Sequence, residues 1–382
     1  MTGGEGYVLP AADLTQLLDA LARRGYVLVG PTVREAAIVY DRIRSAADLP
    51  VGLTDEQEAG RYRLRPRQDA AYFGYAVGPH SWKRFLHPPE RLLWKAVRDD
   101  QAFRLEVSPP DGVRYAFVGV RACELAALQV LDRVFSAGPY VDALYRTRRE
   151  DSFVVAVHCG QAGGTCFCAS MGTGPHCAGG YDLALTEILE GEHRFYLEVG
   201  TSRGEEVRRE VPCRAATEED RQAAARAVAQ AVSQMGRQLD TSNLRDLLVR
   251  NLEHPRWDEV AGRCLSCGNC TLVCPTCFCF TVEDTTDLSG EVAERRARWD
   301  SCFTLGFSYL HGGSVRSTVR ARYRQWLTHK LATWWDQFGT SGCVGCGRCI
   351  TWCPVGIDLT EEVAAIRLTD GARAAEGSVE GA

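Results

Sequence analysis

Several kinds of segment are missing from this sequence, and each absence excludes a class of protein. No run of about 18 apolar residues is present, which excludes a transmembrane helix. The first residues, Met-Thr-Gly-Gly-Glu-Gly-Tyr, lack the basic and apolar regions of a secretion signal, so no such signal is visible. The net charge is −5, whereas a nucleic-acid-binding surface needs an excess of basic residues.

The sequence also lacks the usual signatures of an active site. The glycines at residues 160–174 do not form Gly-x-Gly-x-x-Gly after a strand, so a dinucleotide site is not supported. We find no nucleophile–base pair, phosphate-binding loop or pair of carboxylates with catalytic spacing. The composition is that of an ordinary globular protein, and 382 residues are enough for two or three domains.

Cysteine is the abundant exception, with 17 residues. Disulfides are rare in a reducing cytosol, so a cysteine-rich pattern there indicates metal, and we expect a cytoplasmic protein. Eight cysteines lie in two runs, at residues 264–275 and 343–354, which both read Cys-x2-Cys-x2-Cys-x3-Cys-Pro. Bacterial ferredoxins hold [4Fe–4S] clusters with this spacing, because soft thiolate ligands suit iron–sulfur centres.

The two runs predict two clusters held as a crossed pair. In two-cluster ferredoxins the fourth cysteine of each run ligates the other cluster. The expected ligands are Cys264, Cys267, Cys270 and Cys353 for the first cluster, and Cys343, Cys346, Cys349 and Cys274 for the second. A structural zinc site is the alternative, since Cys-x2-Cys pairs also bind zinc. Zinc takes four ligands, and four cysteines are present in each run. A zinc site nevertheless fits less well, because each run also has proline and apolar residues beside its cysteines.

Further cysteines gather after two expected strands in the N-terminal half. Residues 114–120 and 153–157 read as strands, and residues 124–135 read as a helix after the first of them. Open α/β sheets usually place ligands at the C-terminal ends of their strands. A third [4Fe–4S] cluster is therefore expected on Cys123, Cys159, Cys166 and Cys168. Cys177 competes for the fourth position, and the alternative is that some of these cysteines are buried as small apolar side chains.

The predicted fold class is α+β. Residues 1–214 read as a mixed α/β domain that carries the third set of cysteines, with a hairpin at residues 193–207. Residues 215–382 read as an α-helical ferredoxin domain, nearly all helix and cluster loop. Its basic segment at residues 316–338 fits equally a solvated helix face and docking to an acidic partner. No role is assigned to Cys177, Cys213, Cys277, Cys279 or Cys302, although the last three could ligate a further site or shield the clusters.

Clusters of this kind move single electrons, so the residues alone indicate an electron-transfer protein with no catalytic residues of its own. A metal-stabilised scaffold without a redox role is the alternative from another class of protein.

Longer segments around these cysteines resemble a known family. They are Gly-Pro-His-Ser-Trp-Lys at 78–83, Gly-Val-Arg-Ala-Cys-Glu-Leu at 119–125, Thr-Cys-Phe-Cys-Ala-Ser-Met-Gly-Thr-Gly-Pro at 165–175, Arg-Cys-Leu-Ser-Cys-Gly-Asn-Cys at 263–270, Arg-Tyr-Arg-Gln-Trp at 322–326 and the whole of 341–358. The chain resembles the β subunit of cytosolic NAD(P)-linked [NiFe] hydrogenases, or sulfhydrogenases. The A subunit of anaerobic sulfite reductase is similar in the same segments. The match at 322–326 and 343–358 favours the hydrogenase.

The resemblance implies an iron–sulfur subunit that works inside an oxidoreductase complex. One implied partner is a flavin subunit that handles NAD(P)H, and the others are the small and large subunits that carry the NiFe centre. In a sulfite reductase complex, a sirohaem subunit would take the place of the NiFe pair.

Overall fold

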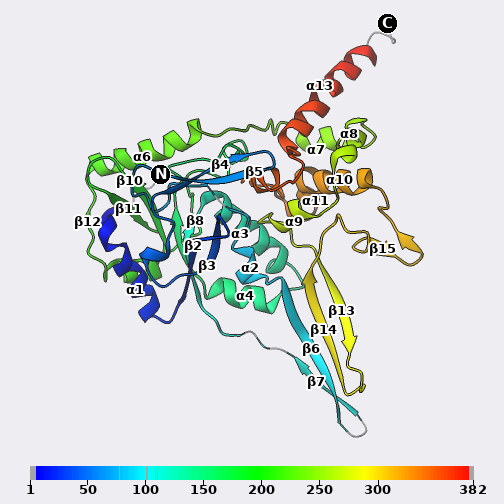
Figure 1. Ribbon diagram of the computed structural model, residues 1–382, viewed down its shortest axis with the longest axis horizontal. Coiled ribbons are helices and arrows are strands. Elements are labelled where there is room, and N and C mark those ends of the chain that lie inside the picture. The colour runs from blue at the N-terminus through cyan, green and yellow to red at the C-terminus, as the bar shows by residue number, and fades with distance from the viewer. Residues whose placement is uncertain (1–5, 77, 100–101, 108, 110, 378–382) are drawn as a thin grey trace.

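The computed structural model describes residues 6–76, 78–99, 102–107, 109 and 111–377, the last seven of them as backbone only. The N-terminal half is built around a mixed sheet of eight strands (Figure 1). In spatial order the strands are β12 (Arg214–Ala215), β1 (Tyr7–Pro10), β11 (Arg194–Val199), β10 (Leu183–Ile188), β9 (Phe153–Val157), β8 (Tyr115–Val120), β2 (Val27–Arg34) and β3 (Ala37–Arg42). The central strands β10, β9, β8 and β2 run parallel, and the outer strands pair antiparallel.

Helices cover both faces of this sheet, so its central strands are buried on both sides, as parallel strands usually are. Along β8, Ala116 and Val118 point into one hydrophobic core while Tyr115 and Phe117 point into the other. The first face is covered by α1 (Leu14–Arg23) and α5 (Ser202–Arg208), and the second by α2 (Lys83–Leu86), α3 (Ala122–Phe135) and α4 (Ala143–Glu150). The expected strand–helix unit at residues 114–135 is therefore present.

The expected hairpin at residues 193–207 is wrong in its second strand. Strand β11 pairs with β10 and β1, and the residues after it form helix α5. Thr201 caps this helix by accepting a hydrogen bond from the Gly204 N–H, and Val207 is buried in the core of the sheet. A side-chain cap and one buried position are enough to fix a short helix here.

Helix α6 (Glu218–Ser233) begins at the capping box of Thr217 and Asp220 and packs on β10 and β11. Asp220 also pairs with Arg194 and Arg214, which fixes the start of the helix to the edge of the sheet. The domain boundary near residue 215 stays a prediction, and these contacts group α6 with the sheet that precedes it.

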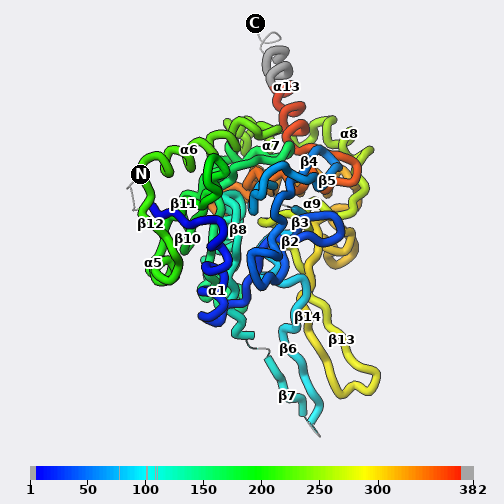
Figure 2. The backbone as a smooth tube through the Cα atoms, turned by 60° about the vertical axis from the view of Figure 1, so that its left-hand side comes forward, coloured from blue at the N-terminus to red at the C-terminus, as the bar shows by residue number. Residues whose placement is uncertain are grey.

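A long four-stranded arm projects from the body of the molecule (Figures 1 and 2). Its strands, in order, are β13 (Phe280–Thr286), β14 (Val292–Trp299), β6 (Glu90–Asp99) and β7 (Ala102–Val107). The expectation of a nearly all-helical C-terminal half is therefore wrong here. Strands β13 and β14 form a hairpin because Asp287 accepts hydrogen bonds from the N–H groups of Glu291 and Val292. Strand β14 also pairs with β6 from the other half of the chain.

The rest of the C-terminal half is helical and has its own hydrophobic core. Its helices are α7 (Leu244–Arg250), α8 (Arg256–Arg263), α9 (Asn269–Leu272), α10 (Val319–Thr328), the π-helix η3 (His329–Thr333), α11 (Trp334–Phe338), α12 (Arg348–Thr351) and α13 (Leu359–Gly377). The short helices α9 and α12 occupy the same place in the two cysteine runs, and each follows a glycine with φ of +74°. Within the described residues, no helix is both long and apolar enough to cross a membrane.

The hairpin of β4 (Leu53–Glu58) and β5 (Arg61–Pro66) joins the two halves. The Gly60 N–H donates to the Ile350 carbonyl of the second run, and Tyr62 stacks on Trp352 at 5.1 Å between ring centroids. The second cysteine run is thus held against the N-terminal half.

Candidate iron–sulfur centres

The first expected ligand set, Cys264, Cys267, Cys270 and Cys353, surrounds one small cavity. Cys264 follows helix α8, and Cys353 comes from the second run, so the predicted crossing is compatible with the chain path. Phe303, Tyr323 and Trp326 form the apolar wall of this cavity. Burial raises the pKa of Cys270 well above its ordinary value, and the neighbouring thiols of the same set raise it further.

The second expected set, Cys343, Cys346, Cys349 and Cys274, lies deeper in the molecule. Burial raises the pKa of Cys349 well above its ordinary value, and the thiols of Cys343, Cys346 and Cys274 add to this effect. Cys349 also lines the cavity of the first set, so the two sets are neighbours. Each run donates one backbone N–H to its first cysteine, from Ser266 to Cys264 Sγ and from Gly345 to Cys343 Sγ, both at 3.4 Å.

The third expected set, Cys123, Cys159, Cys166 and Cys168, gathers beyond the ends of β8 and β9. Cys123 lies in the first turn of α3, and Cys159 follows β9 by two residues. Burial raises the pKa of Cys168 above its ordinary range, and the thiols of Cys159 and Cys166 raise it further. Cys123 and Cys168 pack against Cys346, which makes the third set a neighbour of the second.

Cys177 lies beside Cys159 of the third set, with which it competes for the fourth ligand position. Burial raises the pKa of Cys177 well above its ordinary value, and the thiol of Cys159 raises it further. The Cys177 N–H donates to His158 Nδ1 at 2.9 Å, which fixes this part of the loop to the residue that precedes Cys159.

A single zinc ion requires its thiolate ligands to lie close together. Zinc–sulfur bonds of about 2.3 Å in a tetrahedron place the sulfurs roughly 3.8 Å apart. The described residues include all the cysteines, and no three cysteine sulfurs among them lie within 4.8 Å of one another. Among the described residues the cysteine sulfurs thus form no tight tetrahedral group, and the assignment of the three sets to iron–sulfur clusters stays a prediction.

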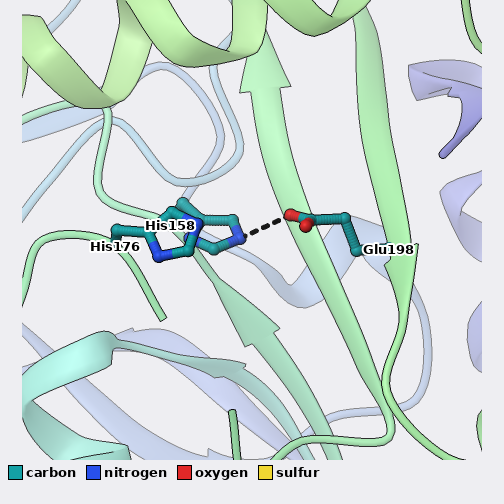
Figure 3. A group of neighbouring side chains, drawn as sticks. All are labelled: His158, His176 and Glu198. Atoms are coloured by element: carbon teal, nitrogen blue, oxygen red, sulfur yellow. Dashed lines mark hydrogen bonds and ion pairs between the residues drawn. The ribbon is translucent and has the colours of Figure 1, made fainter. Parts of the chain in front are cut away.

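A compact group of His158, His176 and Glu198 lies beside the third set (Figure 3). His158 Nε2 contacts Glu198 Oε2 at 2.9 Å, while its Nδ1 accepts the Cys177 N–H, so both ring nitrogens are already engaged. Burial works against the charge of Glu198, but the hydrogen bond from His158 keeps the pKa of Glu198 below its ordinary value. The group therefore reads as a support for the Cys159 and Cys177 loops, and sequence reasoning missed it because Glu198 lies on a distant strand.

Two buried lysines lie beside Cys274. Lys330 Nζ donates to Cys274 Sγ at 3.1 Å, whereas Lys83 Nζ donates to the carbonyls of Cys274 and Cys277 at 3.1 and 2.8 Å. Burial opposes the charge of Lys330, yet the thiols of Cys274, Cys277 and Cys343 raise its pKa well above the ordinary value. For Lys83, burial prevails and lowers the pKa.

A buried ion pair connects the second and third sets. Arg348, between Cys346 and Cys349, pairs with Glu124, which follows Cys123. Glu124 Oε2 also accepts hydrogen bonds from Tyr40 Oη at 2.8 Å and Trp82 Nε1 at 2.9 Å. Since Trp82 and Tyr40 come from the N-terminal half, this network ties both halves to the cluster loops.

The remaining cysteines fall into two groups. Cys277, Cys279 and Cys302 line a cavity of about 340 Å³ beside Lys330. A hydrogen bond with Cys302 lowers the pKa of Cys279 to about 7. Cys213 packs against the core of the main sheet, away from all of these groups.

The basic segment at residues 316–338 is mostly engaged within the chain. Arg320 and Arg324 pair with Glu253, and Lys330 is buried. These pairings account for much of the positive charge without an acidic partner.

Comparisons with known proteins agree with the cysteine pattern. A family model described as a 4Fe-4S dicluster domain matches residues 263–357, which contain both runs. The chain is 31% identical to the β subunit of sulfhydrogenase 2 from Pyrococcus furiosus over 289 residues, covering 75% of this chain and 82% of the relative. No solved structure matches. The resemblance read from the sequence is confirmed, and the chain belongs to the family of sulfhydrogenase β subunits, which are iron–sulfur proteins of the hydrogenase type.

Proposed function

We infer that this chain relays electrons in a cytoplasmic [NiFe] hydrogenase complex, between a flavin subunit that handles NAD(P)H and the small and large subunits that carry the NiFe centre. The observation that carries this inference is the continuity of the three cysteine sets. Cys349 reaches the cavity of the first set, and Cys346 of the second set packs against Cys168 of the third. A row of neighbouring centres suits transfer through the chain, whereas a scaffold has no need of one.

The row would consist of two [4Fe–4S] clusters on the crossed sets and a third on Cys123, Cys159, Cys166 and Cys168. Such clusters accept and release one electron at a time. The residues of this chain would hold them and exclude water, since most of the cysteines of the second and third sets are buried. Cys267 is exposed and Leu265 is 63% exposed, so the first set is the one closest to a partner.

The first experiment asks whether the chain is redox active. The purified, anaerobically reconstituted chain is reduced with dithionite and followed by electron paramagnetic resonance. We expect about twelve iron atoms per chain and reducible cubane signals, as three [4Fe–4S] clusters require. Absence of any reducible cubane signal would leave only the scaffold.

The third cluster is tested by iron content in Cys123→Ser, with Cys213→Ser as the matched control. We expect Cys123→Ser to lose about four iron atoms per chain, the content of one cubane, and Cys213→Ser to lose none. If the iron content of Cys123→Ser stays at the wild-type level, Cys123 is not a ligand. The iron contents of the single variants Cys159→Ser and Cys177→Ser are then compared, and the variant that loses about four iron atoms identifies the fourth ligand.

The partners are tested on the native complex. Nickel together with hydrogen-dependent reduction of NAD(P) is the expected result. Sirohaem without nickel would instead assign the chain to a sulfite reductase complex.

A further inference from the structure

The two cysteine runs share their ligand spacing, but their surroundings differ beside the last cysteine of each run. Two residues after its last cysteine, the first run has Thr276, and the second run has Val355 at the corresponding place. Thr276 Oγ1 lies 3.1 Å from Cys274 Sγ and donates to the Gly342 carbonyl at 2.6 Å. Val355 packs on the apolar core near Cys353 and offers no hydrogen bond.

Lys330 enlarges this difference. It lies in the π-helix η3, whose extra residue per turn shifts the side chains after it, and π-helical turns are frequent at functional sites. Only 2% of Lys330 is exposed. Its ammonium group uses all three hydrogens, donating to Cys274 Sγ at 3.1 Å, Thr276 Oγ1 at 3.2 Å and the Gly342 carbonyl at 3.1 Å.

We propose that Lys330 is a positioning residue that raises the reduction potential of the cluster held by Cys343, Cys346, Cys349 and Cys274. This inference rests on the proposed function. On reduction one electron enters the cluster, so its negative charge grows by one, while no bond breaks and no proton moves. A fixed ammonium group that donates to a ligand sulfur stabilises the more negative state, and hydrogen bonds and net charge near the sulfurs are known to set such potentials.

Burial makes this effect strong and selective. Only 2% of Lys330 is exposed to solvent, so its charge is poorly screened toward Cys274. Among the hydrogen bonds of the described residues, no charged side chain donates to Cys353 Sγ, the corresponding sulfur of the first set. Lys330 thus makes the two clusters unequal although their ligand spacing is the same.

The test is a redox titration of the full, reconstituted chain monitored by electron paramagnetic resonance. Lys330→Met removes the charge at similar length, and Lys330→Arg keeps it. Thr276→Val is the matched control, because it removes a hydroxyl at the same site without changing charge. We expect Lys330→Met to lower one midpoint, shifting the ratio of reduced to oxidised cluster at least tenfold, which is 59 mV for a one-electron couple. The other midpoints should stay unchanged, and Thr276→Val and Lys330→Arg should shift the same midpoint less.

Three results would overturn the proposal. In the first, all midpoints of Lys330→Met equal those of the wild type. In the second, Lys330→Arg shifts the midpoint as far as Lys330→Met does, so the charge is not responsible. In the third, Lys330→Met and Lys330→Arg both lose about four iron atoms per chain, which would mean that Lys330 is needed to hold the cluster and does not set its potential. A wild-type chain without any reducible cluster refutes the electron-transfer function itself, which separates the two failures.

Discussion

The ion pair of Glu124 and Arg348 offers the sharpest stability prediction. Glu124 is 1% exposed and Arg348 is 0% exposed, so both charges are removed from water. Glu124→Gln keeps an amide oxygen for Tyr40 and Trp82 but removes the negative partner of the guanidinium group. Breaking a buried pair by neutralising one member costs about 3–5 kcal/mol, because the other charge remains buried and unpaired. We expect the free energy of unfolding to fall by that amount.

The assay is urea unfolding of the iron-loaded chain under anaerobic conditions, followed by tryptophan fluorescence. Asp284→Asn is the control, since the pair of Asp284 with Arg295 is exposed on the arm and is worth less than about 1 kcal/mol. The double variant Glu124→Gln/Arg348→Met should recover part of the loss, because it leaves no unpaired charge. If Glu124→Gln and Asp284→Asn cost the same, the pair does not hold the two halves together and the reasoning is refuted.

Two further predictions concern pH and the glycine turns of the runs. Burial, with the charges of Lys83 and Arg91, lowers the pKa of His87 to about 3, so the folded chain keeps this ring neutral while the unfolded chain protonates it below about 6.5. The free energy of unfolding should therefore fall as the pH falls from about 6.5 to 3. In urea unfolding, His87→Phe should reduce the loss of stability between pH 7 and pH 5 by about 2 kcal/mol. An unchanged loss of stability in this variant would contradict the prediction. Gly347→Ala should lower iron content more than Gly268→Ala, because both have φ of +74° but a Cβ at Gly347 meets the Thr165 backbone and one at Gly268 meets the Ser301 side chain. Equal iron contents in the two variants would show that the close approach of the second run to Thr165 does not affect iron binding.

Elements with a local signal could be predicted from the sequence. The strand at β8 and the helix α3 follow from apolar periodicity, and α6 follows from its capping box at Thr217. The dicluster domain can be predicted from the spacing of the two cysteine runs alone, since the consecutive cysteines of each run lie within one short loop.

Elements fixed by distant contacts could not be predicted. Strand β14 owes its place to β6, which precedes it by almost two hundred residues, so neither strand shows its partner locally. Residues 193–207 were expected to form a hairpin, but the cap at Thr201 and the burial of Val207 favour helix α5 after β11. The contacts of Lys83 are likewise distant, since it reaches the carbonyls of Cys274 and Cys277, which lie 191 and 194 residues after it.

The same limit applies to the chemistry of the candidate site. Spacing predicts where thiolates gather, and it does so equally well for both runs, because it depends only on the chain within each loop. What makes the runs unequal comes from elsewhere: Lys330 lies 56 residues after Cys274, and Glu124 lies 224 residues before Arg348. Both groups are polar side chains in apolar surroundings, and burying them without partners would cost several kcal/mol. Each therefore needs an acceptor that the fold supplies, and in both cases the fold supplies it beside a cysteine loop. The residues that distinguish one centre from the next are thus set by tertiary packing, while the residues that would bind iron are set by local spacing.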